Sequence, residues 1–173
     1  YQASGHGHHL LDIYVPRALP EDLAPGRDPA TYTAPHPVVL YIHGGAFRIL
    51  SKDTHWVMAL AFARRGFLVF SINYRLAPQH PFPAALEDAA AALLYVQKAA
   101  AQYQGDLSRL VFAGESAGAN LVTALSLLTL LPSHVDSQPW AKQVFDSGLV
   151  PRVVLPMCGI LQVSDAARFA RRR

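Results

Sequence analysis

The sequence predicts an α/β fold in which a mostly parallel sheet carries helices on both faces. The main observation is that short runs of β-branched and aromatic residues alternate along the chain with longer helix-forming segments. The composition agrees, since 51% of the 173 residues are hydrophobic and 16% are charged, as in ordinary globular domains. The chain has no internal repeat, and we expect a single domain over residues 1–173.

The expected strands are short apolar runs. Leu10 to Val15 forms the first and ends at Pro16. Later runs, typical of strands buried on both faces, cover residues 38–42, 67–73 and 110–113, and residues 152–156 are a last strand candidate. Between the first two strands, residues 16–37 hold six of the 13 prolines. We expect a surface loop there, because proline cannot pair inside a sheet.

Helices are expected in three of the segments between these strands, over residues 53–65, 84–103 and 117–131. Asp53 is expected to cap the first, and Gly66 is placed to end it. The third is apolar, but polar residues interrupt it and it is shorter than the roughly 20 residues that a bilayer requires. We therefore expect a buried helix and no transmembrane segment.

Charge and cysteine content exclude some functions. The formal net charge of +3 depends partly on a cluster of arginines at residues 168–173. No basic stripe runs through the rest of the chain, so we expect no nucleic-acid partner. Cys158 is the only cysteine, which excludes an intramolecular disulfide. The N-terminus has no pattern of a secretory signal, and we expect a cytoplasmic protein.

The first chemical motif is Gly114-Glu115-Ser116-Ala117-Gly118, which follows one expected strand and opens an apolar helix. A sharp strand-to-helix turn crowds the backbone, and a Cβ at Gly114 or Gly118 would collide with neighbouring elements. Ser116 would then project at a helix N-terminus, where free N–H groups favour developing negative charge. Taken alone, the pattern also fits a serine on an ordinary tight turn.

The second motif is His43-Gly44-Gly45-Ala46-Phe47, which follows another expected strand upstream. A loop with two glycines can turn its backbone N–H groups toward one point, as an oxyanion hole requires. A glycine-rich turn with a structural histidine is the alternative for this motif alone. The two motifs in this order, each after a strand, favour a serine-hydrolase site.

Four segments together resemble the hormone-sensitive-lipase-like group of α/β-hydrolase esterases, over residues 10–156. They are the HGGAF loop at 43–47, YRLAP at 74–78, HPFPAA at 80–85 and GESAGAN at 114–120. The resemblance implies an α/β-hydrolase fold and a small carboxylic ester as substrate, with no cofactor and no metal. Two positions depart from the group: Ala46 replaces the usual third glycine of the loop, and Glu115 stands where aspartate is common.

By the same resemblance, Ser116 is the nucleophile. The backbone N–H groups of Gly45, Ala46 and Ala117 form the oxyanion hole. His43 holds its loop in shape and is not the catalytic base, and Arg75 and Asp88 are structural. The residues that support the two motifs are His43, Gly44, Gly114, Glu115 and Gly118.

The sequence does not complete a catalytic triad. In this architecture the order is serine, acid, then histidine, but His134 is the only histidine after Ser116 and no Asp or Glu lies between them. We expect His134 to be a surface residue, the acid and histidine to be absent, and the hydrolase domain to be truncated at its C-terminus. The GHGHH run at residues 5–9 is expected to be a flexible tail and not a metal site.

Two alternatives to an esterase stay open. One is a non-catalytic protein of the same fold that binds a ligand or a partner; the other is an amidase or formamidase, which would use the same two motifs. Phe47, Trp56 and residues 127–135 are candidates for lining a pocket.

Overall fold

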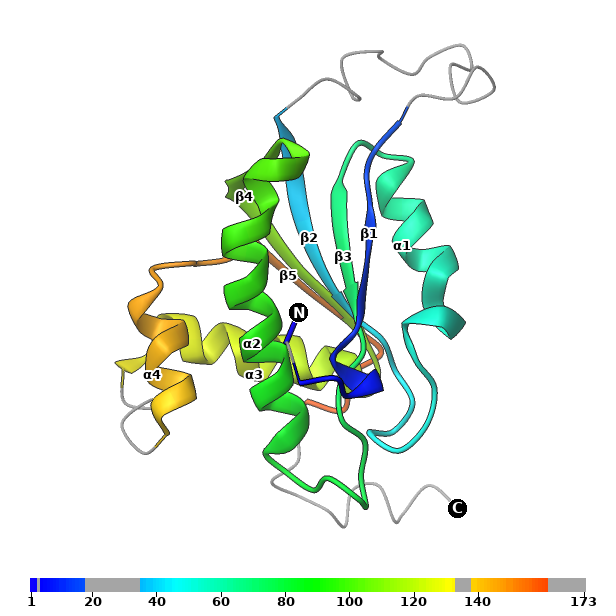
Figure 1. The fold of residues 1–173 in the computed structure, drawn as a ribbon, viewed down its shortest axis with the longest axis vertical. Coiled ribbons are helices and arrows are strands. Elements are labelled where there is room, and N and C mark those ends of the chain that lie inside the picture. Colours follow the sequence, from blue (N-terminus) through cyan, green and yellow to red (C-terminus); the bar gives the residue numbers. More distant parts are fainter. Residues whose placement is uncertain (3, 18–34, 133–137, 162–173) are drawn as a thin grey trace.

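The chain forms one five-stranded sheet with the strand order β1-β3-β2-β4-β5 (Figure 1). A computed structural model describes residues 1–2, 4–17, 35–132 and 138–161. The strands are β1 (Leu11–Tyr14), β2 (His36–Ile42), β3 (Leu68–Ile72), β4 (Gly105–Glu115) and β5 (Val153–Met157). Only β1 runs antiparallel to its neighbour, while the other three pairings are parallel. The expected mostly parallel sheet is therefore confirmed.

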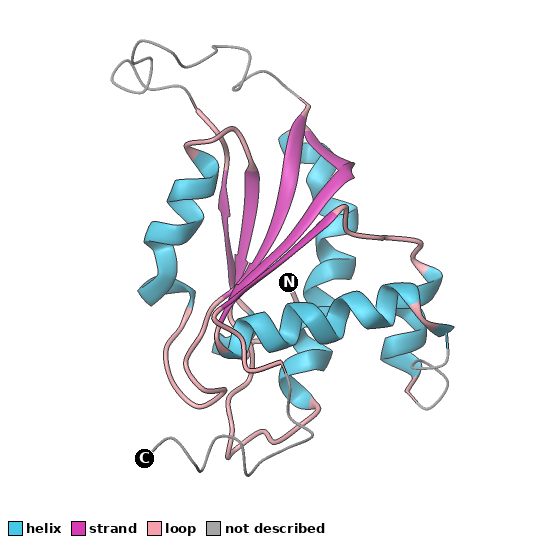
Figure 2. Cartoon of the chain, turned by 180° about the vertical axis from the view of Figure 1, so that it is seen from behind, coloured by secondary structure: helices cyan, strands magenta, loops and turns pink. Residues whose placement is uncertain are grey.

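Helices cover both faces of this sheet (Figure 2). They are α1 (Trp56–Ala63), α2 (Ala84–Ala99), α3 (Ala117–Leu130) and α4 (Pro139–Asp146). Alternate residues of β2 point to opposite faces: Leu40 belongs to the apolar cluster that includes residues of α2, α3 and α4, whereas Tyr41 belongs to the cluster that includes residues of α1. The buried strand residues are almost all apolar, which explains why the strands read as continuous hydrophobic runs.

Two element boundaries differ from expectation. The turn before α1 is a 3₁₀ helix, Lys52–His55, and its cap is Ser51 instead of the expected Asp53. The Ser51 hydroxyl accepts a hydrogen bond from the Asp53 amide at 3.2 Å, so Asp53 lies inside the first turn. The helix expected to reach residue 103 ends as an α-helix at Ala99 and continues as a 3₁₀ turn.

The histidine run near the N-terminus is ordered at its end, so the expected flexible tail is wrong there. Gly7–His9 forms a 3₁₀ turn, and His9 is only 7% exposed. Its Nε2–H donates to Asp88 Oδ1 at 3.1 Å. Asp88 is completely buried, and a buried carboxylate needs such partners.

The outermost parallel strand, β5, is open on one face within the described residues. Val153 and Leu155 are 46% and 37% exposed. They pair with Val111 and Ala113, whose side chains belong to the apolar cluster beneath α1. The expected strand is thus present, and it lies at an edge of the described sheet. No helix among the described residues is long and apolar enough to cross a membrane.

Candidate active site

Ser116 occupies a sharp turn between β4 and α3. The strand ends at Glu115 and the helix begins at Ala117, so a single residue connects them. Ser116 has φ 52° and ψ −110°, a conformation that side-chain-bearing residues rarely adopt. The residue is exposed. The turn expected from the GESAG motif is confirmed.

Glycines allow α3 to begin directly against the end of β2. A Cβ on Gly118 would lie 2.0 Å from the Ile42 carbonyl oxygen and 2.7 Å from that of His43. A Cβ on Gly114 would lie 2.4 Å from the carbonyl oxygen of Gly118. These distances are too short for any side chain, and the steric reason given for both glycines holds. The close approach brings the loop after β2 beside Ser116.

The HGGAF loop packs on the serine turn. A Cβ on Gly44 would lie 3.0 Å from the Glu115 carbonyl oxygen and 3.4 Å from Ser116 Cβ. Farther along the loop, Gly45, Ala46 and Phe47 all have positive φ, at 121°, 52° and 62°. Ala46 thus adopts the left-handed conformation that a third glycine would take without strain.

A small cavity joins the two motifs. Its volume is about 220 Å³. It is lined by Ala46, Phe47, Ser116, Ala117, Asn120 and Ile160. Two of the three expected oxyanion donors, Ala46 and Ala117, therefore share a cavity with the serine; Gly45 lies in the same loop but is not among these lining residues.

The end of β5 and the residues that follow it also support the serine turn, and no sequence motif indicates this contact. The Ser116 amide donates to the Met157 carbonyl oxygen at 2.8 Å, so this amide is already used. Asn120 Nδ2 donates to the Ile160 carbonyl oxygen at 2.9 Å. Both bonds join residues about 40 positions apart, a relation that no local pattern reveals.

His43 bonds to its own loop. Its Nδ1–H donates to the Gly44 carbonyl oxygen at 2.6 Å, and the Tyr74 hydroxyl donates to the His43 carbonyl oxygen at 3.2 Å. The rings of His43 and Tyr74 stack with centroids 4.4 Å apart. Burial lowers the pKa of His43 to about 4, so the ring is neutral near pH 7. This geometry suits a histidine that shapes the loop.

Charged side chains pair at two places. Glu115 Oε2, in the serine turn, lies 3.8 Å from His55 Nε2, on the 3₁₀ turn before α1. Farther away, the Arg75 guanidinium contacts both carboxylate oxygens of the buried Asp88, at 2.8 to 2.9 Å, and that of Glu87 at 2.9 Å. The Arg75 backbone N–H also donates to Asp88 at 2.8 Å. The pair braces the segment between β3 and α2.

No histidine in the described part of the chain hydrogen-bonds to the Ser116 hydroxyl. The expectation that His134 is a surface residue falls outside the described residues, as do Asp136 and Asp165, two of the acidic residues that follow it in the sequence. Asp146 lies at the exposed end of α4, where it pairs with Lys142 at 2.6 Å. Within the described ranges, no three or more His, Cys, Asp or Glu side chains are placed to hold a metal ion.

Known proteins share this fold and these two motifs' region of the chain. Residues 39–156 match the model of a family described as alpha/beta hydrolase fold. The chain is 45% identical over 93 residues to carboxylesterase NlhH of Mycobacterium tuberculosis, an alignment that covers 53% of this chain and 29% of that protein.

Solved structures give the same result. The structure of EstE1, a thermostable carboxylesterase cloned from a metagenomic library, matches with a TM-score of 0.63 and 33% identity, over 84% of this chain and 40% of that one. Esterase LipW from Mycobacterium marinum matches with a TM-score of 0.53 and 42% identity, over 57% and 32%. The chain spans less than half the length of each of these relatives. It belongs to the α/β-hydrolase family, in the hormone-sensitive-lipase-like group of esterases.

Proposed function

We propose that this chain carries the nucleophile and the oxyanion hole of a carboxylic ester hydrolase that acts on small-molecule esters. One observation carries the proposal: the exposed Ser116, on its strained turn, shares a cavity with the oxyanion loop. The printed names of the relatives, carboxylesterase and esterase, support the same chemistry.

In the proposed reaction, Ser116 Oγ attacks the ester carbonyl carbon while its proton passes to a general base. The carbonyl oxygen becomes an oxyanion, which the N–H groups of Gly45, Ala46 and Ala117 stabilise. The C–O bond to the alcohol then breaks, the alcohol leaves with a proton, and an acyl-serine remains. Water hydrolyses this ester by the same steps and releases the acid.

The proposal assigns Ser116 to the attack and no residue of this sequence to the base. A positioned general base contributes about 10²- to 10⁴-fold to the rate, so a serine that attacks without one turns over slowly. We therefore expect the 173-residue chain to be a weak, serine-dependent esterase.

The test measures hydrolysis of p-nitrophenyl butyrate by the purified chain and by two alanine variants. Ser116→Ala should remove the activity above background. Ser126→Ala is the matched control, because Ser126 lies on α3, the helix that follows Ser116, is buried and donates to the Thr123 carbonyl oxygen. Activity that survives in Ser116→Ala would contradict the proposal, and fast serine-dependent turnover would show that the chain supplies a base.

A further inference from the structure

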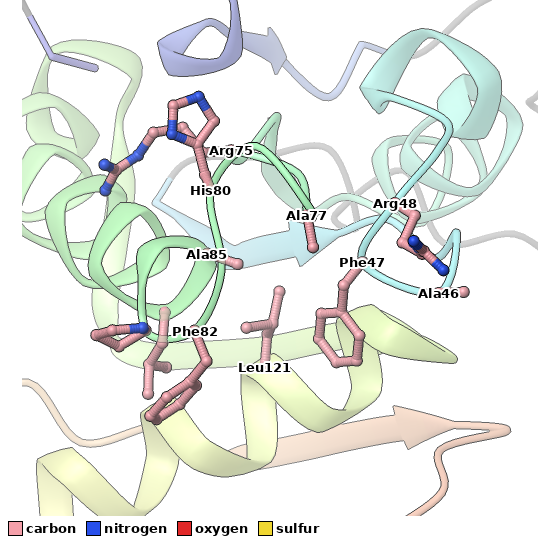
Figure 3. A pocket seen from close by; sticks show the side chains of 11 residues that line it. Ala46, Phe47, Arg48, Arg75, Ala77, His80, Phe82, Ala85 and Leu121 are labelled. Atoms are coloured by element: carbon pink, nitrogen blue, oxygen red, sulfur yellow. The ribbon is translucent and has the colours of Figure 1, made fainter.

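A larger cavity lies on the other side of Phe47 from the serine. It has a volume of about 320 Å³ and its wall includes Leu86 of α2 and Leu121 of α3. Ala46 and Phe47 line both this cavity and the one that contains Ser116. In Figure 3 the side chains of Phe47, Leu121 and Phe82 follow one another along α3. The cavity therefore opens beside the proposed oxyanion hole.

A third cavity continues in the same direction. It has a volume of about 400 Å³ and is lined by Leu127 and Leu128 of α3 and by Trp140 of α4. Phe82, Pro83 and Leu86 line both the second and the third cavity. We call the three cavities together the α3 groove, since residues of α3 line each of them.

The lining of the α3 groove suits an apolar ligand. Phe82 is 86% exposed although it borders two cavities, and exposed apolar clusters of this kind often mark binding sites. Arg48, Arg75 and His80 also line the second cavity. Of these, the Arg75 guanidinium is already bound by Asp88 and Glu87. Along this wall that cation is neutralised, and the groove offers mainly hydrocarbon surface.

The length of the α3 groove follows from the rise of the α3 helix. With a rise of 1.5 Å per residue, Leu121 lies about 8 Å and Leu128 about 18 Å along the axis from Ser116. An extended chain advances about 1.2 Å per bond, since three backbone bonds span about 3.5 Å. A chain of about seven bonds therefore fills the cavity beside Leu121, and one of about 15 bonds reaches Leu128 and Trp140.

We propose that the α3 groove binds a long unbranched aliphatic chain of the ester, with the ester group at Ser116 and the methyl end beside Trp140. This inference rests on the proposed function, because it places the head group at the proposed nucleophile. Palmitoyl-length chains fill the whole groove, while octanoyl-length chains end near Leu121.

The experiment uses Trp140 as a reporter. The chain has two tryptophans, so Trp56→Phe leaves Trp140 as the only one. Trp56 is exposed on α1 and is not among the residues that line the groove. Trp140 emission is followed during titration with octanoate, with palmitate, and with palmitate brominated either near its methyl end or near its carboxylate, because bromine quenches tryptophan at contact.

Palmitate is expected to change Trp140 emission, octanoate is expected not to, and bromine near the methyl end should quench more than bromine near the carboxylate. Ala124→Phe fills the third cavity, which Ala124 lines. It should weaken palmitate binding about tenfold or more, since lost contact with two methylenes has that effect. Leu130→Phe, at an exposed position of the same helix outside the groove, should leave binding unchanged.

Hexadecanol with the same bromine labels shows whether the alcohol half of an ester can occupy the groove in place of the acyl half. Equal quenching from both bromine positions, an equal response to octanoate, or no response to palmitate would each overturn the proposal. Serine-dependent hydrolysis of a short ester without a Trp140 response would refute the binding proposal for the α3 groove but support the proposed function. A Trp140 response without serine-dependent hydrolysis would refute the proposed function but support binding of an aliphatic chain in the α3 groove.

Discussion

Replacing Ser116 by glycine is expected to stabilise the chain although it removes the proposed nucleophile. The residue has φ 52° and ψ −110°, and a non-glycine residue held in such a region stores about 1–3 kcal/mol. Glycine adopts this conformation freely but loses about 0.5–1 kcal/mol more in conformational entropy on folding. The difference predicts a gain in the free energy of unfolding of about 1 kcal/mol, and at most about 2.5 kcal/mol.

The assay is urea denaturation followed by circular dichroism, with a thermal melt beside it. For a chain of this size, each kcal/mol corresponds to a rise in Tm of about 2–4 °C. Ser116→Ala is the reference, because it removes the same hydroxyl but keeps the Cβ and with it the strain. If Ser116→Gly is no more stable than Ser116→Ala, the turn stores no strain and the reasoning is refuted.

Three further predictions concern stability, each measured as the free energy of unfolding in urea. Gly118→Ala should lower it by more than about 2 kcal/mol, because the added Cβ meets the Ile42 carbonyl oxygen at 2.0 Å; a near-neutral effect would show that α3 can move away from β2. Asp88→Ala should lower it by about 2–3 kcal/mol, because Asp88 is completely buried and its loss leaves the His9 ring and the Arg75 amide without their acceptor. Glu87→Ala, which loses a more exposed contact with Arg75, should lower it by less than about 1 kcal/mol; equal effects would contradict the structural role of Asp88. The folded-state pKa of His43 is lowered to about 4, so the unfolded chain binds more protons and stability should fall by about 2–3 kcal/mol between pH 6.5 and 4.5. His43→Gln should lose that part of the pH dependence, and an unchanged pH profile would exclude His43 as its source.

Much of the fold could be predicted because its signals are local. Strands buried on both faces are read as uninterrupted apolar runs, and β2 and β3 lie where those runs lie. The serine turn could also be predicted, because close backbone contacts require the glycines of the GESAG motif. The catalytic roles of Ser116 and of the oxyanion donors stay predictions.

Features that depend on distant partners could not be predicted. β4 begins at Gly105, five residues before its apolar run, because its first residues pair with the start of β2. His9 is held by a hydrogen bond to the carboxylate of Asp88, 79 positions away, and nothing in the GHGHH run indicates that partner. The sequence predicts Asp53 as the cap before α1, but Ser51 forms it, because both residue types are good caps and only the backbone geometry selects one.

The hydrogen bond from the Ser116 amide to Met157 makes the reactive turn depend on the outermost strand of the described sheet. Edge strands open more often than central ones, and an amide exchanges its hydrogen when its acceptor moves away. Exchange at Ser116 should therefore follow the opening of β5 and not that of central β2. Any molecule or chain segment that pairs with β5 would slow this exchange and hold Ser116 more steadily, so the edge strand determines how well the proposed nucleophile is positioned.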